Sequence, residues 1–412
     1  MRATQAFAGA ASVAALHVLD GAFLDRWHGE SAGRGAPAAI LAVLFAGAAG
    51  FVWPRLPRGP RALSALVAGL ITSVAGALSV ATVAAGSAEG VAQSGLLLVP
   101  VGVVMLACAA AAMRHAPPRS RPERWGRRAV GVVAVALSLM WIVMPVGVAL
   151  VAEGKPRGAV RADALGLPHE EVAFRSSDGL RLTGWYVPSR NGAAIVIVHG
   201  GGGDRAGGAR HARMLARHGY GVLLYDARGR GESEGRPDAI GWTWQRDVAG
   251  ALGWLKHRPD VDPERIGGLG LSTGAETLLE AAARRDDLRA VVADGAAGRS
   301  LPEVTRVVGA SDVPYWTALY AATRVLTASS SPPDLGRLVR GLRAPALLIA
   351  AGRSQEADFN RIYAARSRGR ARLWHVPDAG HTRALRRHPG AYEARVTGFF
   401  DAALDAPTRN RT

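Results

Sequence analysis

The sequence contains one cysteine, Cys108, among 412 residues. A single thiol cannot form an intramolecular disulfide, so no disulfide framework holds this fold together. Lysine is nearly absent as well, because Lys155 and Lys256 are the only two, and arginine supplies almost all of the formal net charge of +17. No zinc-ligand, helix-turn-helix or RNP pattern accompanies that charge, so we expect no nucleic-acid partner.

Charged residues are also scarce, at 20% of the chain, and the mean hydropathy is +0.10. Disordered chains are rich in charge and poor in apolar residues, so this composition excludes extensive disorder. The charges are unevenly spread, since residues 1–153 contain only 12 Lys and Arg and 6 Asp and Glu. The chain therefore divides near Glu153 into an apolar N-terminal part and a more polar C-terminal part.

Long runs without Asp, Glu, Lys or Arg fill the N-terminal part. A helix needs about 20 apolar residues to cross a hydrocarbon core. Four runs reach that length and a fifth, shorter run begins the chain; they are residues 35–54, 62–88, 90–113, 129–152 and 3–19. We therefore predict an all-α transmembrane domain of four or five helices over residues 1–153, which makes the lipid bilayer an expected partner.

The orientation of that predicted domain follows from its basic loops. Arginines concentrate in residues 114–128 and 54–61. Because basic loops tend to stay in the cytoplasm, a multi-pass protein of the cell membrane is expected, with everything after Glu153 on the extracytoplasmic side.

After a linker at residues 154–167, the pattern changes to short apolar runs that alternate with helical segments. Residues 172–175 and 180–187 flank a Ser-Ser-Asp-Gly turn and predict an antiparallel hairpin. Six further runs predict buried parallel strands, at 194–198, 221–225, 265–269, 290–293, 346–350 and 372–376. Residues 168–412 are therefore expected to form an α/β domain, with a doubly wound, mostly parallel sheet.

Three motifs follow predicted strands, where open α/β sheets bind their ligands. Gly270-Leu271-Ser272-Thr273-Gly274 lies between a strand and a helix, the context of a nucleophile elbow. His199 and the four glycines after it follow another strand, where backbone N–H groups can approach an oxyanion; Gly201 and Thr273 are the expected donors. His381 follows the last strand, in the position of a general base.

Together with the stretch Tyr225-Asp226-Ala227-Arg228-Gly229-Arg230-Gly231-Glu232-Ser233, these motifs resemble the α/β-hydrolase superfamily of serine hydrolases. The branch they are most similar to is that of serine aminopeptidase-like and dipeptidyl-peptidase-like hydrolases. This resemblance implies that Asp226 and Arg228 are structural. It covers residues from about 168 to 405.

One position departs from that family's pattern. The resemblance implies a catalytic Asp about three residues after Gly352, but that position is Gln355, which cannot stabilise an imidazolium by charge. The neighbouring Glu356 is the favoured acid. Asp294 and Asp358 remain alternatives, as does the absence of any acid.

The implied chemistry is acyl transfer to water. His381 takes the proton of Ser272, whose oxygen attacks an ester, thioester or amide, with an esterase- or lipase-like reaction favoured. The substrate is then a small or lipid-like acyl compound, and no metal or cofactor is expected. Residues 295–343 form a candidate lid. The alternative function is a weakened or inactive hydrolase fold that binds or senses a ligand.

Overall fold

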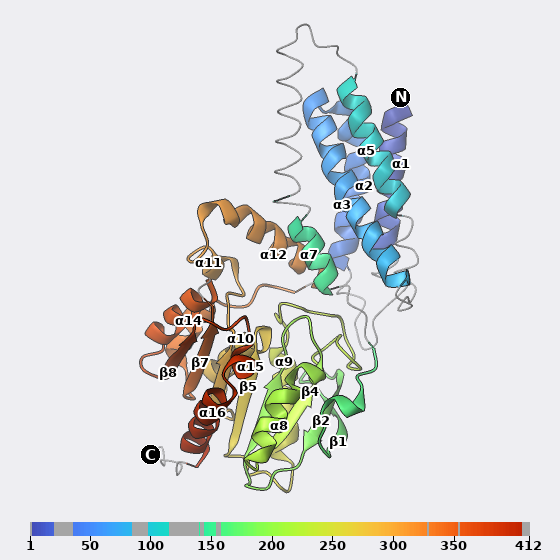
Figure 1. The fold of residues 1–412 in the computed structure, drawn as a ribbon. Helices are drawn as coiled ribbons and strands as arrows, with labels where there is room; N and C mark the ends of the chain where they lie inside the picture. The colour runs from blue at the N-terminus through green and yellow to red at the C-terminus, as the bar shows by residue number, and fades with distance from the viewer. Residues whose placement is uncertain are drawn as a thin grey trace. The chain divides into compact units, whose positions relative to one another are not determined.

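The computed structural model describes residues 2–19, 36–84, 98–114, 140, 144–153, 158–327, 329–352 and 355–405 (Figure 1). The chain forms two compact units. The first comprises Met1–Pro156 together with Ser311–Ala328, and the second comprises Arg157–Ala310 and Ser329–Thr412. Each unit has its own apolar core, so each is described by itself.

The first unit is helical. Its helices are α1 (Arg2–Leu19), α2 (Ala36–Phe51), the 3-10 turn η3 (Trp53–Arg55), α3 (Arg58–Ala84), α5 (Leu98–Arg114), α7 (Met144–Glu153) and α12 (Val313–Thr327). Its core includes Phe7 and Trp53, whose rings stack with centroids 4.3 Å apart, and the buried thiol of Cys108. Helices α3 and α5 pack closely, since a methyl group on Gly102 would lie 2.7 Å from the backbone nitrogen of Ser73.

The predicted transmembrane domain is wrong for the described residues. No helix among them is both long enough and apolar enough to cross a membrane. A run without charges indicates an apolar composition but does not show that one unbroken helix spans the run. The helices described within three of these runs are short, since α2 has 16 residues, α5 has 17 and α7 has 10. Helix α3 reaches 27 residues, but its described part does not qualify as a membrane span either.

Parts of the predicted spans lie outside the described residues, namely 85–97 and 129–143 except Met140. The predicted extracytoplasmic side for the C-terminal part was derived from those spans. It loses that basis with them.

The second unit is built on an eight-stranded sheet with the order β1-β2-β4-β3-β5-β6-β7-β8. Its strands are β1 (Glu170–Arg175), β2 (Arg181–Val187), β3 (Ala194–Val198), β4 (Gly221–Tyr225), β5 (Ile266–Leu271), β6 (Ala290–Asp294), β7 (Ala346–Ala351) and β8 (Ala371–Val376). Only the β1–β2 and β2–β4 pairs are antiparallel. The predicted mostly parallel sheet of an α/β hydrolase is confirmed, and every predicted strand forms with ends shifted by at most two residues.

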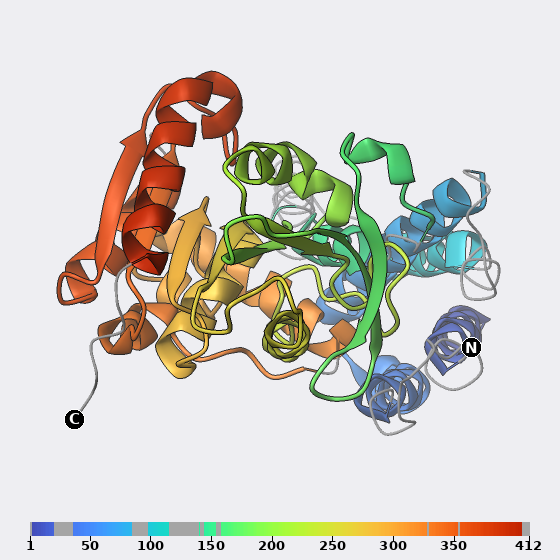
Figure 2. The same ribbon diagram turned by 90° about the horizontal axis from the view of Figure 1, so that it is seen from below.

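Helices cover both faces of this sheet. They are α8 (Ala209–Arg217), α9 (Gln245–Lys256), α10 (Thr273–Arg284), α14 (Gln355–Arg366) and α16 (Pro389–Leu404), with short helices α11 (Leu301–Val304), α13 (Leu335–Leu338) and α15 (Ala384–Arg387). Short 3-10 turns also occur in the second unit, namely η6 (Ala162–Ala164), η7 (Arg205–Gly208) and η9 (Val339–Gly341). The turn η8 (Ala310–Asp312) begins with the last residue of this unit's first segment and continues into Ser311–Ala328 of the first unit. Figure 2 shows α8 and α16 on one side of the sheet and α9 on the other. All five residues of β3 and of β4 are buried, as expected for central strands covered on both faces.

The predicted linker at 154–167 is in part structured. Residues Ala162–Ala164 form the turn η6, and Leu165 is fully buried in the core of the second unit. The second unit therefore begins before the predicted start at residue 168.

Residues between β6 and β7, the candidate lid, divide between the two units. Ser311–Ala328 belongs to the helical unit, where α12 packs against α7 and α2. Its side chains Leu319 and Tyr320 are buried there. An amphipathic helix thus finds its apolar partner among N-terminal helices, and the chain leaves and re-enters the hydrolase unit around this insertion.

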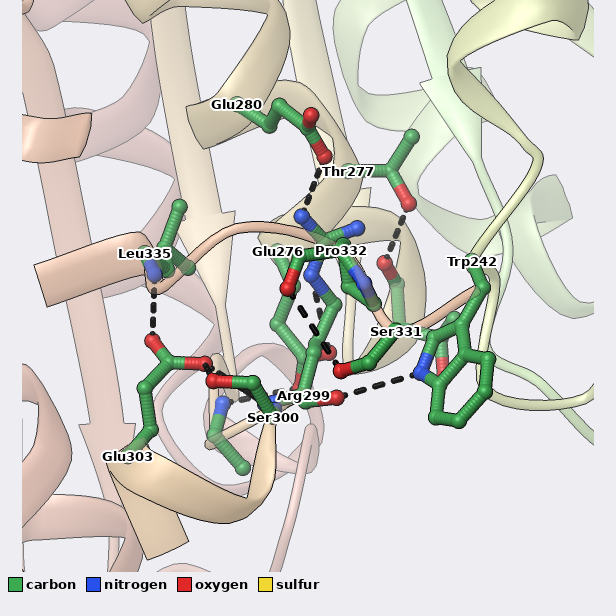
Figure 3. A network of polar contacts seen from close by, with 12 residues as sticks. Trp242, Glu276, Thr277, Glu280, Arg299, Ser300, Glu303, Ser331, Pro332 and Leu335 are labelled. Carbon is green, nitrogen blue, oxygen red and sulfur yellow. Dashed lines mark hydrogen bonds and ion pairs between the residues drawn. The ribbon is translucent and has the colours of Figure 1, made fainter. Parts of the chain in front are cut away.

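The place where the insertion leaves and returns is held by one buried carboxylate. Glu303 accepts hydrogen bonds from the Leu335 amide on the returning side and from the Ser300 hydroxyl on the departing side, at 2.6 and 2.9 Å (Figure 3). Nearby, the buried guanidinium of Arg299 pairs with Glu280, and the Arg299 carbonyl accepts the indole N–H of Trp242 at 3.1 Å. These contacts fix the loop that follows β6.

Candidate active site

Ser272 occupies the sharp turn between β5 and α10. Its backbone has φ 52° and ψ −120°, which is strained for a residue with a side chain. The turn is held because the Ser272 amide donates to the carbonyl of Asp294 at 2.8 Å. A methyl group on Gly270 would lie 2.3 Å from the Gly274 carbonyl oxygen, and one on Gly274 would lie 2.1 Å from the Val198 carbonyl oxygen. Only glycine fits at these two positions, and the turn presents the Ser272 hydroxyl above the sheet.

His381 reaches this hydroxyl from the loop between β8 and α15. Its Nε2 lies 2.9 Å from the Ser272 Oγ. This distance allows the imidazole to accept the hydroxyl proton directly, as a general base must. The two residues are 109 positions apart in the chain and meet because both follow the carboxyl ends of parallel strands.

Glu356 holds the other side of the imidazole. Its Oε2 lies 2.6 Å from the His381 Nδ1, and its Oε1 accepts the Ala351 amide N–H at 2.6 Å. The carboxyl group is buried and sits in the first turn of α14, whose N-terminus favours negative charge. Hydrogen bonding to Glu356 raises the pKa of His381 above its ordinary value of 6.5, against the opposing effect of burial. We call Ser272, His381 and Glu356 the triad.

In the described part of the chain, the other acidic candidates make no hydrogen bond to His381. Gln355 and Asp358 are exposed, and Asp358 pairs with Arg361 at 2.7 Å. Asp294 is fully buried at the end of β6, where its Oδ2 accepts the Tyr392 hydroxyl at 3.0 Å. Of the three carboxylates considered, Glu356 alone is hydrogen-bonded to the imidazole among the described residues.

The two expected oxyanion donors lie side by side next to the nucleophile. A methyl group on Gly201 would lie 2.8 Å from the Thr273 Oγ1, and one on Gly200 would lie 3.4 Å from the Ser272 Cβ. Thr273 is the first residue of α10, so its amide N–H has no acceptor within the helix. Two backbone donors at this corner could stabilise a negatively charged oxygen bound to the Ser272 Oγ.

Polar contacts fix the loop that carries Gly201. His199 accepts the Ala227 amide N–H at its Nε2, at 3.0 Å, and its Nδ1 lies 2.7 Å from the Gly200 carbonyl oxygen. Asp226, expected to be structural, accepts the Arg205 amide at 2.7 Å and pairs with the Arg205 guanidinium. Arg228 is buried between Asp247 and Asp178. Asp226 and Arg228 are therefore engaged in buried ion pairs that fix the loops around them.

The other histidines within the described ranges do not gather into a metal site. Among the described residues, no group of three or more His, Cys, Asp or Glu side chains is arranged to hold a metal ion. His218 is partly exposed and pairs with Glu393 at 2.9 Å. His211 is buried, because α8 turns it inward with its ring against Tyr392. Burial lowers the pKa of His211 to about 4.

Comparisons with known proteins agree with this architecture. The profile of the X-Pro dipeptidyl-peptidase (S15) family matches residues 159–383, more than half of the chain. An esterase of Pyrococcus furiosus has a similar fold, with a TM-score of 0.51 and 20% identity over 61% of this chain and 98% of that one.

Among curated proteins, the Escherichia coli protein YfhR is 34% identical over 133 residues, which are 30% of this chain and 46% of that relative. A Mycobacterium tuberculosis protein, Rv2307c, is 35% identical over 185 residues, 44% of this chain and 60% of that relative. The chain thus spans about half the length of these relatives. A thiohydrolase of Aspergillus aculeatus, aneE, is 34% identical over 128 residues, 30% of this chain and 40% of that protein.

The sheet topology and the comparisons define the α/β-hydrolase fold class for the second unit. Within that class, the chain belongs to the X-Pro dipeptidyl-peptidase (S15) family. The predicted superfamily is therefore confirmed for the C-terminal unit. The predicted membrane domain attached to it is not.

Two contacts of the site could not be predicted from the sequence. The Ala351 amide that holds Glu356 is a backbone group, which no motif marks. The hydrogen bond between Tyr392 and Asp294 joins α16 to the end of β6, although the two residues are 98 positions apart in the chain. Neither local sequence pattern predicts this contact.

Proposed function

We propose that this chain is a serine hydrolase that cleaves an ester, thioester or amide through an acyl-enzyme on Ser272. The observation that carries the proposal is the hydrogen-bonded triad, with 2.9 Å between hydroxyl and imidazole and 2.6 Å between imidazole and carboxylate. An ester is the favoured substrate, because the similar fold from Pyrococcus furiosus is that of an esterase.

In the first half of the reaction, the His381 Nε2 removes the Ser272 proton as the hydroxyl oxygen attacks the substrate carbonyl. The carbonyl oxygen becomes negatively charged, and in this proposal the amides of Gly201 and Thr273 donate to it. Glu356 stabilises the imidazolium that forms. His381 then donates its proton to the leaving group, and the acyl group stays on Ser272.

In the second half, His381 activates water by the same proton transfer. Water attacks the acyl carbonyl, the Ser272 oxygen regains its proton, and the acid product leaves. All proton transfers pass through the His381 Nε2, so the hydrolysis needs no group beyond these side chains and two backbone amides.

The alternative of an inactive binding module was motivated by Gln355. That motivation weakens here, because Glu356 supplies the carboxylate from the neighbouring position. Turnover measurements decide between the two functions.

The test is a panel of chromogenic esters, thioesters and Xaa-Pro amides, measured with the full chain and with Ser272→Ala. Ser311→Ala, an exposed serine remote in sequence, serves as the matched control. We expect hydrolysis of at least one class, abolished by Ser272→Ala and unchanged in the control. Equal turnover by Ser272→Ala would overturn the acyl-enzyme, and saturable binding without turnover by the wild type would favour the binding module.

A further inference from the structure

A second carboxyl group lies beneath the triad, and the reaction described above does not use it. Asp294 ends β6 and is fully buried. Its Oδ2 accepts the Tyr392 hydroxyl at 3.0 Å, while its Oδ1 is buried without a hydrogen-bond partner among the described residues. A buried oxygen left unpaired is unfavourable for folding, so its retention calls for a functional explanation.

The backbone around Asp294 supports two members of the triad. The Asp294 carbonyl accepts the amide of Ser272, at 2.8 Å. The next residue, Gly295, lies against the base, because a methyl group there would be 2.9 Å from the His381 Cε1 and 3.2 Å from its Nδ1. The end of β6 is therefore the surface on which the imidazole rests, and it brings the Asp294 carboxyl group close to the ring.

We propose that Asp294 is a positioning residue whose buried carboxyl group, held by Tyr392, adds its charge to that of Glu356 in stabilising the protonated imidazole of His381. The inference rests on the proposed function, since it concerns the same reaction. Glu356 acts on the ring through a hydrogen bond and its charge, whereas Asp294 acts through its charge alone.

The groups that act on Asp294 come from three elements, and two further titratable groups lie next to those groups. Tyr392 reaches it from α16, Glu356 from α14 and His381 from the β8–α15 loop. Glu276, one turn after Ser272 on α10, also acts electrostatically on His381, and burial raises the pKa of Glu276 to about 8. His211 of α8 packs against the Tyr392 ring and remains neutral near neutrality, because burial lowers its pKa.

These surroundings make the charge of Asp294 depend on pH. Burial, together with the charge of Glu356, raises the pKa of Asp294 to about 7, although the Tyr392 hydroxyl acts in the opposite direction. Below that pH, Asp294 is neutral and Glu356 acts alone. Above it, the second negative charge appears and favours the imidazolium that forms in the transition state. The turnover rate kcat therefore rises with pH through two ionisations, one of His381 and one of Asp294.

The test is the pH profile of kcat for Ser272-dependent hydrolysis, measured on both sides of neutrality with the full chain. Asp294→Asn keeps the shape of the side chain but fixes it as neutral. We expect one ionisation in place of two and a plateau lowered by about tenfold, the effect of one pKa unit of interaction. Asp378→Asn is the control, since Asp378 is three positions from His381 but exposed and paired with Arg387 and His388.

Tyr392→Phe gives an independent second reading, which is decisive if Asp294→Asn does not fold. Removing the hydroxyl removes a hydrogen bond that favours the Asp294 carboxylate, so the second ionisation should move to higher pH, with the high-pH plateau largely retained. A profile of Asp294→Asn that superimposes on the wild type would overturn the inference. So would a Tyr392→Phe profile that is lowered uniformly without a shift, which indicates lost packing only. Neither outcome touches the proposed function, which fails if turnover persists in Ser272→Ala or if the wild type binds substrates without turnover.

Discussion

Replacing Glu356 by Gln probes the triad at its least predictable member. The substitution preserves size and shape but exchanges one carboxylate oxygen for an amide NH2. The Ala351 N–H points at the Oε1 position, 2.6 Å away, so the glutamine carbonyl oxygen must take that position. Its NH2 group then faces the His381 Nδ1, which lies 2.6 Å from the Oε2 position.

An NH2 donor can only bond to an unprotonated Nδ1, so the substitution forces the imidazole proton onto Nε2. The Nε2 would then donate toward Ser272 and could no longer accept its proton. The variant also lacks the charge that stabilises the imidazolium. Loss of the correct tautomer and of this charge should lower kcat by about 10³- to 10⁴-fold, or about 4 to 5.5 kcal/mol in activation free energy.

Steady-state hydrolysis of a chromogenic ester measures this effect, with KM expected to change little. Asp358→Asn is the matched control, because Asp358 is exposed on the same helix and pairs with Arg361. The reasoning is refuted if Glu356→Gln retains activity within a few-fold of wild type, or if Asp358→Asn shows the large loss instead.

Three further outcomes are expected. Catalysis needs neutral His381, and the hydrogen bond to Glu356 raises the pKa of His381. The midpoint of the acidic limb in the pH profile of kcat/KM should therefore lie above 6.5, the ordinary histidine value. A midpoint below 6.5 would contradict the effect of that hydrogen bond. Gly274→Ala places a methyl 2.1 Å from the Val198 carbonyl oxygen, so labelling of Ser272 by a fluorophosphonate should fall to background, whereas Gly398→Ala, which meets no atom within 4 Å, should label normally. Glu303→Gln removes the charge that six donors share at the base of the insertion and should lower the free energy of unfolding by about 2–4 kcal/mol in a urea titration. An unchanged midpoint would show that the contacts of Glu303 with Leu335 and Ser300 contribute little.

The sheet could be predicted because buried parallel strands are short, apolar and nearly continuous. Strands such as Ala194–Val198 and Gly221–Tyr225 form at their predicted ends. Ser272 and His381 were identifiable for a related reason, since each directly follows a predicted strand, and parallel strands bring their carboxyl ends to one edge.

The acid was harder to predict because its position depends on where a helix begins. Helix α14 starts at Gln355, so the Gln355 side chain is exposed and the next side chain, Glu356, points inward. Shifting the helix start by one residue would change which side chain points inward, and composition does not reveal that start. The burial of His211 could not be predicted for a similar reason, since arginines beside it in sequence mask the inward face of α8.

The membrane spans predicted for the N-terminal helices were wrong for the described residues because the signal used was too general. Freedom from charge marks an apolar segment, but it does not specify where a helix ends or how apolar that helix is. Helix α12 could not be assigned from local pattern either, because its partner α7 lies far earlier in the chain. Long-range packing of this kind is decided by complementary surfaces and not by periodicity.

The most direct test of the central claim is to trap the acyl-enzyme with a slowly hydrolysed activated ester and to locate the added mass by peptide mapping. We predict a single adduct on the peptide that contains Ser272, absent in Ser272→Ala and strongly slowed in His381→Ala. An adduct on any other residue, or one that forms equally fast without His381, would contradict the account.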